Sequence, residues 1–221
     1  MSNLNLFFPN SSTLGCISAM FFSYSQGFQT VSGMGIKKGK TYHTAVVVIP
    51  PEELWAPIQA IRRLHDCHYR RWMPHITLLY PFRPIEEFTH LREQFQEVLS
   101  DFPAFALRLS SFKEFHHGRG SFTLWLAPEP VEPLLNLLKQ LEKIVPDCTD
   151  TRNFPGGFTP HLSLGQFRGK EHLLSKKQQF KKSWKPIAFV VKEICLIWRN
   201  DPPDDVFRIG EKVFLKSEMR I

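Results

Sequence analysis

Hydrophobic and polar residues alternate along this chain with two different periods, one typical of strands and one typical of helices. Tyr42–Pro50 is rich in β-branched residues and ends at a pair of prolines, which is typical of a buried strand. Over Glu52–Leu64 the apolar residues recur every three or four positions. A helix is expected there, with a buried face formed by Leu54, Ile58, Ile61 and Leu64.

The same two periods predict the remaining elements. Further helices are expected over Ile85–Leu99 and Val131–Val145, and a Lys-rich helix after Phe167. Further strands are expected at Phe105–Phe112, Phe122–Leu126, Ile187–Trp198 and Val206–Lys216. Strands that alternate with helices could indicate a parallel sheet. The neighbouring strands in the middle and at the end of the chain instead favour antiparallel pairing, and hence the α+β class.

Two of the strand-like segments repeat one short pattern, PHITL and PHLSL. Residues two apart in a strand share a face, so His75 and Thr77 are expected on one face, and His161 and Ser163 likewise. The aliphatic residues between them would then point into the core. A single His-x-Thr is usually the solvated side of a sheet, but two copies with matching flanks favour a shared site.

Two imidazoles and two hydroxyls that face one another suit phosphodiester chemistry. One neutral imidazole can take a proton from the attacking water or hydroxyl, while the other, protonated, gives a proton to the departing oxygen. The hydroxyls can donate hydrogen bonds to the non-bridging phosphate oxygens, where charge accumulates. This mechanism needs no metal and no cofactor.

The composition is that of a folded protein with an excess of cations. Of its 221 residues, 43% are hydrophobic and 13% aromatic, which excludes a wholly disordered chain. The net charge of +7 attracts anions such as nucleotide phosphates, although such an excess also serves solubility. Four scattered cysteines without a CxxC pair indicate a reduced, cytoplasmic protein. We also expect a monomer without a membrane-spanning segment.

The first forty residues differ from the rest of the chain. They contain no acidic residue, no Arg and no Lys before Lys37, but many Ser, Asn, Phe and Gly. We expect a disordered extension over residues 1–40 and a single bilobal domain over residues 41–221. A Ser-rich leader without acidic residues would also suit an organelle transit peptide, although the missing Arg argues against one.

Several residues close to the two motifs are candidates for substrate binding: Tyr42, Tyr80, Phe82, Phe167 and Arg168. The rings could stack on a base and the guanidinium could bind phosphate. For at least two of the three aromatic residues next to the motifs, core packing is the favoured role. Tyr80 would face away from His75 in an unbroken strand.

Basic residues also gather near both motifs, before the first at Arg62, Arg63, Arg70 and Arg71, and after the second from Arg168 to Lys185. They could form a rim that binds nucleic acid, or only a solvated helix face. A possible cluster of metal ligands is formed by His65, Cys67 and His68, and His116 and His117 could complete it. Their spacing is irregular, so no metal site is predicted.

The two His-x-hydroxyl tetrads, HITL and HLSL, resemble the signature of the two-histidine (2H) phosphoesterases, which include the 2'-5' RNA ligase-like proteins and cyclic phosphodiesterases. The resemblance covers about residues 41–221. It implies two antiparallel sheets with outer helices, related by pseudo-two-fold symmetry around a central groove. In two respects the chain departs from the family pattern: the first motif continues as LLYPFRP where many relatives run on to a glycine, and the leader lies outside it.

The resemblance also implies an activity, the metal-independent hydrolysis of 2',3'-cyclic phosphate or related 2'-5' linkages in RNA ends or nucleotides. It assigns His75 and His161 as the acid–base pair and Thr77 and Ser163 as phosphate ligands, without deciding which histidine is the acid. Two alternatives use the same groove. One is ligation of RNA ends through a 2'-5' bond, and the other is a nucleotide- or RNA-binding module with little turnover.

Overall fold

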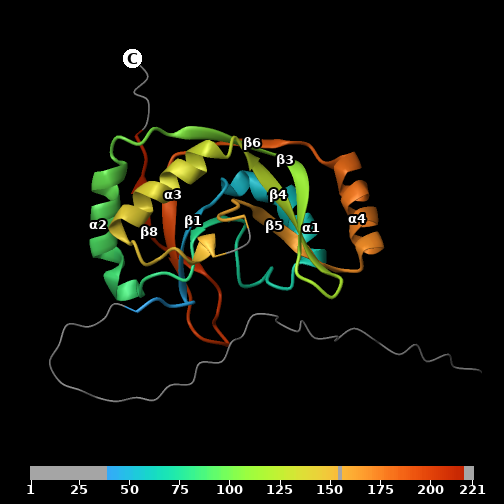
Figure 1. Ribbon diagram of the computed structural model, residues 1–221, viewed down its shortest axis with the longest axis horizontal. Coiled ribbons are helices and arrows are strands. Elements are labelled where there is room, and N and C mark those ends of the chain that lie inside the picture. Colours follow the sequence, from blue (N-terminus) through green and yellow to red (C-terminus); the bar gives the residue numbers. More distant parts are fainter. Residues whose placement is uncertain (1–38, 154–155, 217–221) are drawn as a thin grey trace, which may run out of the picture. The chain divides into compact units, whose positions relative to one another are not determined.

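Two four-stranded antiparallel sheets form the centre of the fold (Figure 1). The computed structural model describes residues 39–153 and 156–216. The first sheet has the order β2-β1-β7-β8, formed by Ile76–Leu79, Thr44–Val48, Glu193–Trp198 and Arg208–Phe214. The second has the order β5-β4-β3-β6, formed by Leu162–Arg168, Ser121–Glu129, Phe105–His116 and Ile187–Val191. The α+β class with two antiparallel sheets is therefore confirmed.

Four α-helices and three short 3-10 turns cover the sheets within the described residues. The helices are α1 (Trp55–His65), α2 (Phe88–Leu99), α3 (Glu132–Ile144) and α4 (Lys170–Ser183). The 3-10 turns are η1 (Glu52–Leu54), η2 (Ile85–Glu87) and η3 (Asp150–Arg152). Every predicted helix is confirmed, and the first two begin with a 3-10 turn. None of the helices in these described ranges has the length and apolar character that crossing a membrane requires.

The predicted strand Ile187–Trp198 is in fact two strands in different sheets. The chain leaves the second sheet at the end of β6 and enters the first sheet as β7, with Lys192 between them. β6 is an edge strand whose residues alternate between buried and exposed, whereas β7 is a central strand with four consecutive buried residues. This difference in burial marks the crossing. The expected extension over residues 1–40 falls almost entirely outside the described residues.

The two motif strands, β2 and β5, are the edge strands of their sheets and contact each other. Their core-facing residues are completely buried, as the sequence predicts: Ile76, Leu78, Leu162 and Leu164. The hydroxyl residues between them, Thr77 and Ser163, are half-buried. The alternation expected of each motif is therefore confirmed.

Each half of the fold places a helix on the sheet of the other half. α1 connects β1 with β2 of the first sheet, yet it packs on β5 of the second. This contact is tight at Gly165, where an added Cβ would lie 2.6 Å from the Cβ of His65. In the same way α3 connects β4 with β5, yet it packs against β2. The two halves are thereby joined through both motif strands.

The loops that precede the motif strands cross over in the same manner. The backbone N–H of Cys67, in the α1–β2 loop, donates to Oε1 of Gln166 on β5, at 3.0 Å. The hydroxyl of Thr151, in the α3–β5 connection, donates to the carbonyl of Leu78 on β2, at 3.1 Å. Both motifs are therefore held from the opposite half.

Candidate active site

The two motif histidines have matching hydrogen bonds. His75 and His161 each precede their motif strand and are half-buried. Nδ1 of His75 lies 2.7 Å from the carbonyl oxygen of Met73, and Nδ1 of His161 lies 2.8 Å from that of Thr159. Because a carbonyl oxygen can only accept, Nδ1 carries the hydrogen in both rings. In the neutral rings Nε2 is therefore the free acceptor, as a general base requires.

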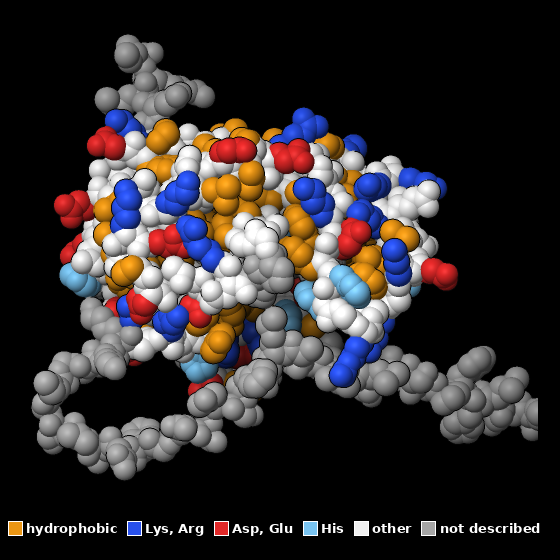
Figure 2. Space-filling view, in the orientation of Figure 1, with side chains coloured by type: hydrophobic (Ala, Val, Ile, Leu, Met, Phe, Trp, Pro, Cys, Tyr) orange, Lys and Arg blue, Asp and Glu red, His pale blue; other side chains and the backbone are white. Residues whose placement is uncertain are grey.

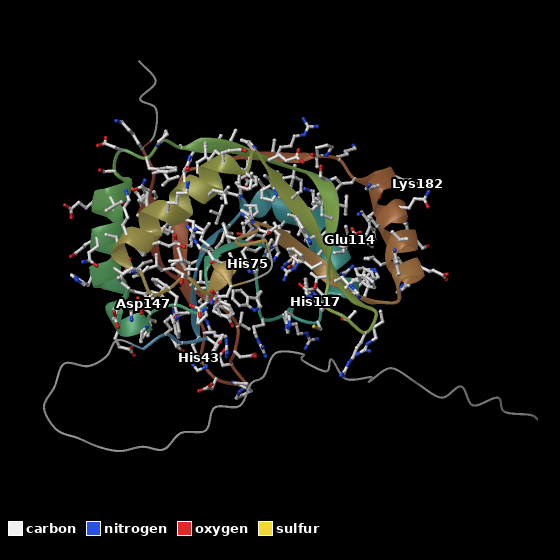
Figure 3. The ribbon with its side chains drawn as sticks, viewed as in Figure 1. His43, His75, Glu114, His117, Asp147 and Lys182 are labelled. Atoms are coloured by element: carbon white, nitrogen blue, oxygen red, sulfur yellow. The ribbon has the colours of Figure 1, made fainter. Side chains whose placement is uncertain are left out.

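The surroundings of both imidazoles favour the neutral form. Burial lowers the pKa of His75 to about 4, with the Met73 carbonyl opposing this and the charges of Arg62 and His161 adding to it. Burial likewise lowers the pKa of His161, against the effect of the Thr159 carbonyl. Figure 3 places His75 near the middle of the molecule.

The motif hydroxyls belong to the same pair of edge strands as the histidines. In the strand pairing Thr77 lies opposite Val47 of β1, and Ser163 opposite Trp125 of β4. Residues two apart share a face, so each hydroxyl projects on the side of its own histidine. The contact between β2 and β5 thus brings two imidazoles and two hydroxyls to facing edges of the two sheets.

Aromatic side chains fix the orientation of both imidazoles. Trp72 stacks on His75, with ring centroids 4.6 Å apart, and is itself stacked on Phe207 at 3.7 Å. On the other side Phe115 meets His161 edge-on at 4.9 Å. Each ring is therefore held by a backbone hydrogen bond and by an aromatic contact, which leaves it little freedom to turn.

A buried ion pair holds the loop that carries Trp72. Nε of Arg62 lies 2.8 Å from Oδ2 of Asp66, and both side chains are only 3% exposed. The same guanidinium donates to the carbonyl of Trp72 at 2.9 Å, and Asp66 accepts from the backbone N–H of His68 at 2.9 Å. Arg62 therefore does not belong to a nucleic-acid-binding rim, and on α1 it takes the inward position that was expected for Leu64, which is 73% exposed.

Tyr42 and Tyr80 lie together near the first histidine. Tyr80 meets Trp72 edge-on at 5.4 Å and Tyr42 at 5.5 Å, so it lies on the side of His75 and not on the opposite side. The reason is a β-bulge between β1 and β2, which breaks the alternation after Thr77. Burial raises the pKa of the Tyr80 hydroxyl. Tyr42 is 62% exposed and lies at the rim.

The other three candidates for substrate binding lie away from the histidines. Phe82 is completely buried and packs against Phe95, and Phe167 is 3% exposed and stacks on His65. Both belong to the hydrophobic core, which leaves no ring face free for a base. Arg168 is exposed at the end of β5, five residues past Ser163, a separation of roughly 16 Å along a strand.

The sequence patterns did not point to three aromatic residues at the site: Trp72, Phe115 and Trp125. Trp72 lies in a polar loop and no periodic pattern points to it. Trp125 lies between two buried leucines on β4, and Phe115 lies between two exposed polar residues on β3, which is a strand signal. That signal could have placed them on the motif side if the order of the strands had been known. Within residues 39–153 and 156–216, no three metal-ligating side chains come together, the His65 and Cys67 region included.

Comparison with known proteins places this arrangement in a family. The profile of the 2'-5' RNA ligase superfamily matches residues 50–203. A Geobacillus kaustophilus protein named "Putative phosphoesterase GK0864" is 28% identical over 126 residues, which are 55% of this chain and 67% of that protein. A second from Geobacillus thermodenitrificans, with a similar name, is 25% identical over the same shares.

Solved structures have the same fold. Escherichia coli LigT in its apo form has a TM-score of 0.54 at 17% identity, with 80% of this chain and 99% of LigT covered. TT0787 of Thermus thermophilus has a TM-score of 0.53 at 22% identity, with 79% and 98% covered. The profile match spans more than half of the chain and the fold agrees. The chain therefore belongs to the 2'-5' RNA ligase superfamily, within the two-histidine phosphoesterases.

Proposed function

We propose that this protein is a metal-independent phosphodiesterase that opens 2',3'-cyclic phosphates at RNA ends or in nucleotides. The observation that carries the proposal is the matched pair of histidines. His75 and His161 each use Nδ1 to bind a backbone carbonyl and keep Nε2 free. Each also lies two residues before a hydroxyl on the same strand face, at Thr77 or Ser163. One free nitrogen for each of two proton transfers is what hydrolysis of a cyclic phosphodiester requires.

The reaction divides between the two imidazoles. Water attacks phosphorus while the neutral ring accepts its proton at Nε2. The bond from phosphorus to one ribose oxygen then breaks, and the second ring, protonated at Nε2, gives its proton to that oxygen. The products are one phosphate monoester and one free ribose hydroxyl. Thr77 and Ser163 donate hydrogen bonds to the two non-bridging oxygens as their charge grows.

The negative charge of the bound phosphate stabilises the protonated form of one imidazole. Burial keeps the pKa of both histidines low in the free protein. A negative charge within a few ångströms of an imidazole raises its pKa, so binding of the phosphate favours protonation of the ring nearer to the leaving oxygen. The substrate thus helps to create the acid that it needs, while the other ring stays neutral as the base.

The relatives support a phosphate ester as the ligand. One solved structure of Escherichia coli LigT is a complex with 3'-AMP, a nucleoside monophosphate. A hydrolysed cyclic phosphate at an adenosine end would leave a group of the same class. Ligation of RNA ends through a 2'-5' bond, after which the superfamily is named, uses the same two proton transfers, with the 5'-hydroxyl of a second RNA as the nucleophile in place of water.

The test is turnover of 2',3'-cyclic mononucleotides and of a short RNA with a cyclic end, in EDTA, by the wild type and by His75→Gln and His161→Gln. His90→Gln, an exposed position on α2, is the matched control. We expect ring opening by the wild type and the control, with losses of roughly a hundredfold or more in both motif variants. Binding without turnover in the wild type would refute the proposal, as would full activity in either motif variant. An RNA with a 5'-hydroxyl end, added to the same reactions, reports ligation as a longer product.

A further inference from the structure

A line of aromatic rings runs from His161 towards the hairpin between β3 and β4. Phe115 on β3 meets His161 at 4.9 Å, and its ring lies 6.5 Å from that of His117, which directly follows β3 in the hairpin. His117 is exposed, and its Nε2 lies 2.8 Å from Oγ1 of Thr123 on β4. Rings spaced along a strand offer stacking surfaces to successive bases of a single-stranded nucleic acid. The line ends at the tip of the β3–β4 hairpin.

Three cationic residues lie near that tip. Ser121 of β4 pairs with Arg168 of β5, and the N–H of Gly169 donates to the carbonyl of Gly120 at 2.9 Å. The start of α4 therefore lies against the hairpin. We call the group formed by Arg119, Arg168 and Lys170 the hairpin-tip patch. All three are exposed, and none forms an ion pair with a carboxylate among the described residues.

Arg119 occupies a backbone conformation that disfavours it. Its φ is +49°, between Gly118 at +80° and Gly120 at +70°. It is the only non-glycine residue with a positive φ in the described ranges. Glycine or asparagine would adopt this conformation with less strain, and strain of this kind gathers where a side chain has a function. An arginine held at the tip of a hairpin presents its charge to solvent.

The turn between β7 and β8, close to the loop that carries Trp72, is acidic instead. This turn carries three aspartates: Asp204 and Asp205 form ion pairs with Arg208 and Arg71, and Oδ1 of Asp201 lies 3.0 Å from Nε2 of His43. At the corner between β4 and α3, Glu129 accepts hydrogen bonds from two serine hydroxyls. The hairpin-tip patch offers a polyanion three cations without a carboxylate partner in the described ranges, whereas the β7–β8 turn presents three aspartates.

We propose that the RNA chain attached to the reacting end runs from His161 over Phe115 and His117, and that its phosphates bind the hairpin-tip patch. This inference rests on the proposed function and adds a direction and a contact surface for the chain. The distance from Ser163 to the patch, roughly 16 Å along β5, leaves room for a few nucleotides. RNA ends of several nucleotides are therefore preferred over cyclic mononucleotides.

The test compares two triple variants that remove the same charge. Arg119→Asn, Arg168→Gln and Lys170→Gln together neutralise the hairpin-tip patch, and asparagine suits the positive φ at the first position. The matched control removes three lysines at the other end of the same lobe, with Lys181→Gln, Lys182→Gln and Lys185→Gln. All three control positions are exposed. Figure 3 shows His117 at the hairpin and Lys182 at the far end of α4, and Figure 2 shows cationic side chains crowded over this helix.

Both variants are assayed with cyclic-ended RNAs of increasing length, up to about six nucleotides, and with a cyclic mononucleotide. We expect the patch variant to lose roughly tenfold in kcat/KM on the longest RNA and nothing on the mononucleotide, with the control near wild type. The slope of log affinity against log salt should fall by about 2, since each phosphate contact with a single strand contributes about 0.7.

Equal losses in both variants would show a general effect of charge and overturn the proposal. So would equal losses on the mononucleotide and the RNA, or no loss in the patch variant. If the wild type turns over no substrate, it is the proposed function that fails. Binding of a labelled six-nucleotide RNA by fluorescence anisotropy then still decides the proposed surface, because the patch variant must bind more weakly than the control.

Discussion

Replacement of His75 should make the protein less sensitive to acid. Burial lowers the pKa of this imidazole to about 4, against an ordinary value of 6.5. Below pH 6.5 the unfolded chain binds a proton at this position that the folded chain does not bind. The free energy of unfolding therefore falls as the pH drops from about 6.5 to about 4, because protonation stabilises the unfolded chain and not the folded one.

The size of the effect follows from the two pKa values. One unit of pKa difference corresponds to about 1.4 kcal/mol, and between pH 7 and pH 4.5 most of the difference is realised. We therefore expect His75 to account for about 2 kcal/mol of the stability that the wild type loses over this range. Gln at this position does not titrate, so His75→Gln should lack this part of the loss.

Urea unfolding at pH 7 and at pH 4.5, followed by circular dichroism, gives the stability that each protein loses between the two pH values. The losses of the variants are then compared with that of the wild type. The wild type and His90→Gln, which removes an exposed imidazole on α2, should show the full acid sensitivity, and His75→Gln about 2 kcal/mol less of it. Equal sensitivity in all three proteins would refute the reasoning. It would mean that His75 is not held neutral by burial in the folded state.

Three further changes test separate parts of the structure. Thr77→Val keeps the shape of the side chain but removes the phosphate donor, so kcat on a cyclic phosphate should fall about a hundredfold with Tm nearly unchanged; a drop in Tm with kcat retained would contradict this role. Gly165→Ala places a Cβ 2.6 Å from that of His65, and urea unfolding should show a loss of about 1 to 3 kcal/mol, whereas unchanged stability would mean that α1 does not pack there. Arg62→Met leaves the carboxylate of Asp66 buried without its partner and should cost about 3 to 5 kcal/mol, a loss that Arg62→Met combined with Asp66→Leu should largely reverse.

Local periodicity was enough to predict most of the elements and the motif strands. The alternation in both tetrads gives the buried and half-buried sides of β2 and β5 correctly, because an edge strand with one face in the core has a clear period of two. The helix α3 follows in the same way from its leucines, of which Leu134, Leu137, Leu138 and Leu141 are buried. These features depend on neighbours in the sequence.

Features that depend on long-range contacts could not be predicted. Lys192 separates two strands of different sheets, and only the pairing partners of β6 and β7 reveal the crossing. The position of Tyr80 depends on a bulge in the pairing with β1. Arg62 points inward because Asp66 and the carbonyl of Trp72 receive it there, although helical spacing alone favours Leu64. The aromatic contacts of the two histidines have the same origin.

The exchange of helices between the halves has a consequence for how the substrate enters. A hinge motion that separated the two sheets would have to detach α1 from β5, where Gly165 and His65 are in close contact, and α3 from β2. That would expose leucines and isoleucines that are now completely buried, at about 25 cal/mol for each Å². The spacing of the two imidazoles is therefore built in during folding. We expect the substrate to reach histidines that are already in place, with adjustment confined to the side chains and loops around them.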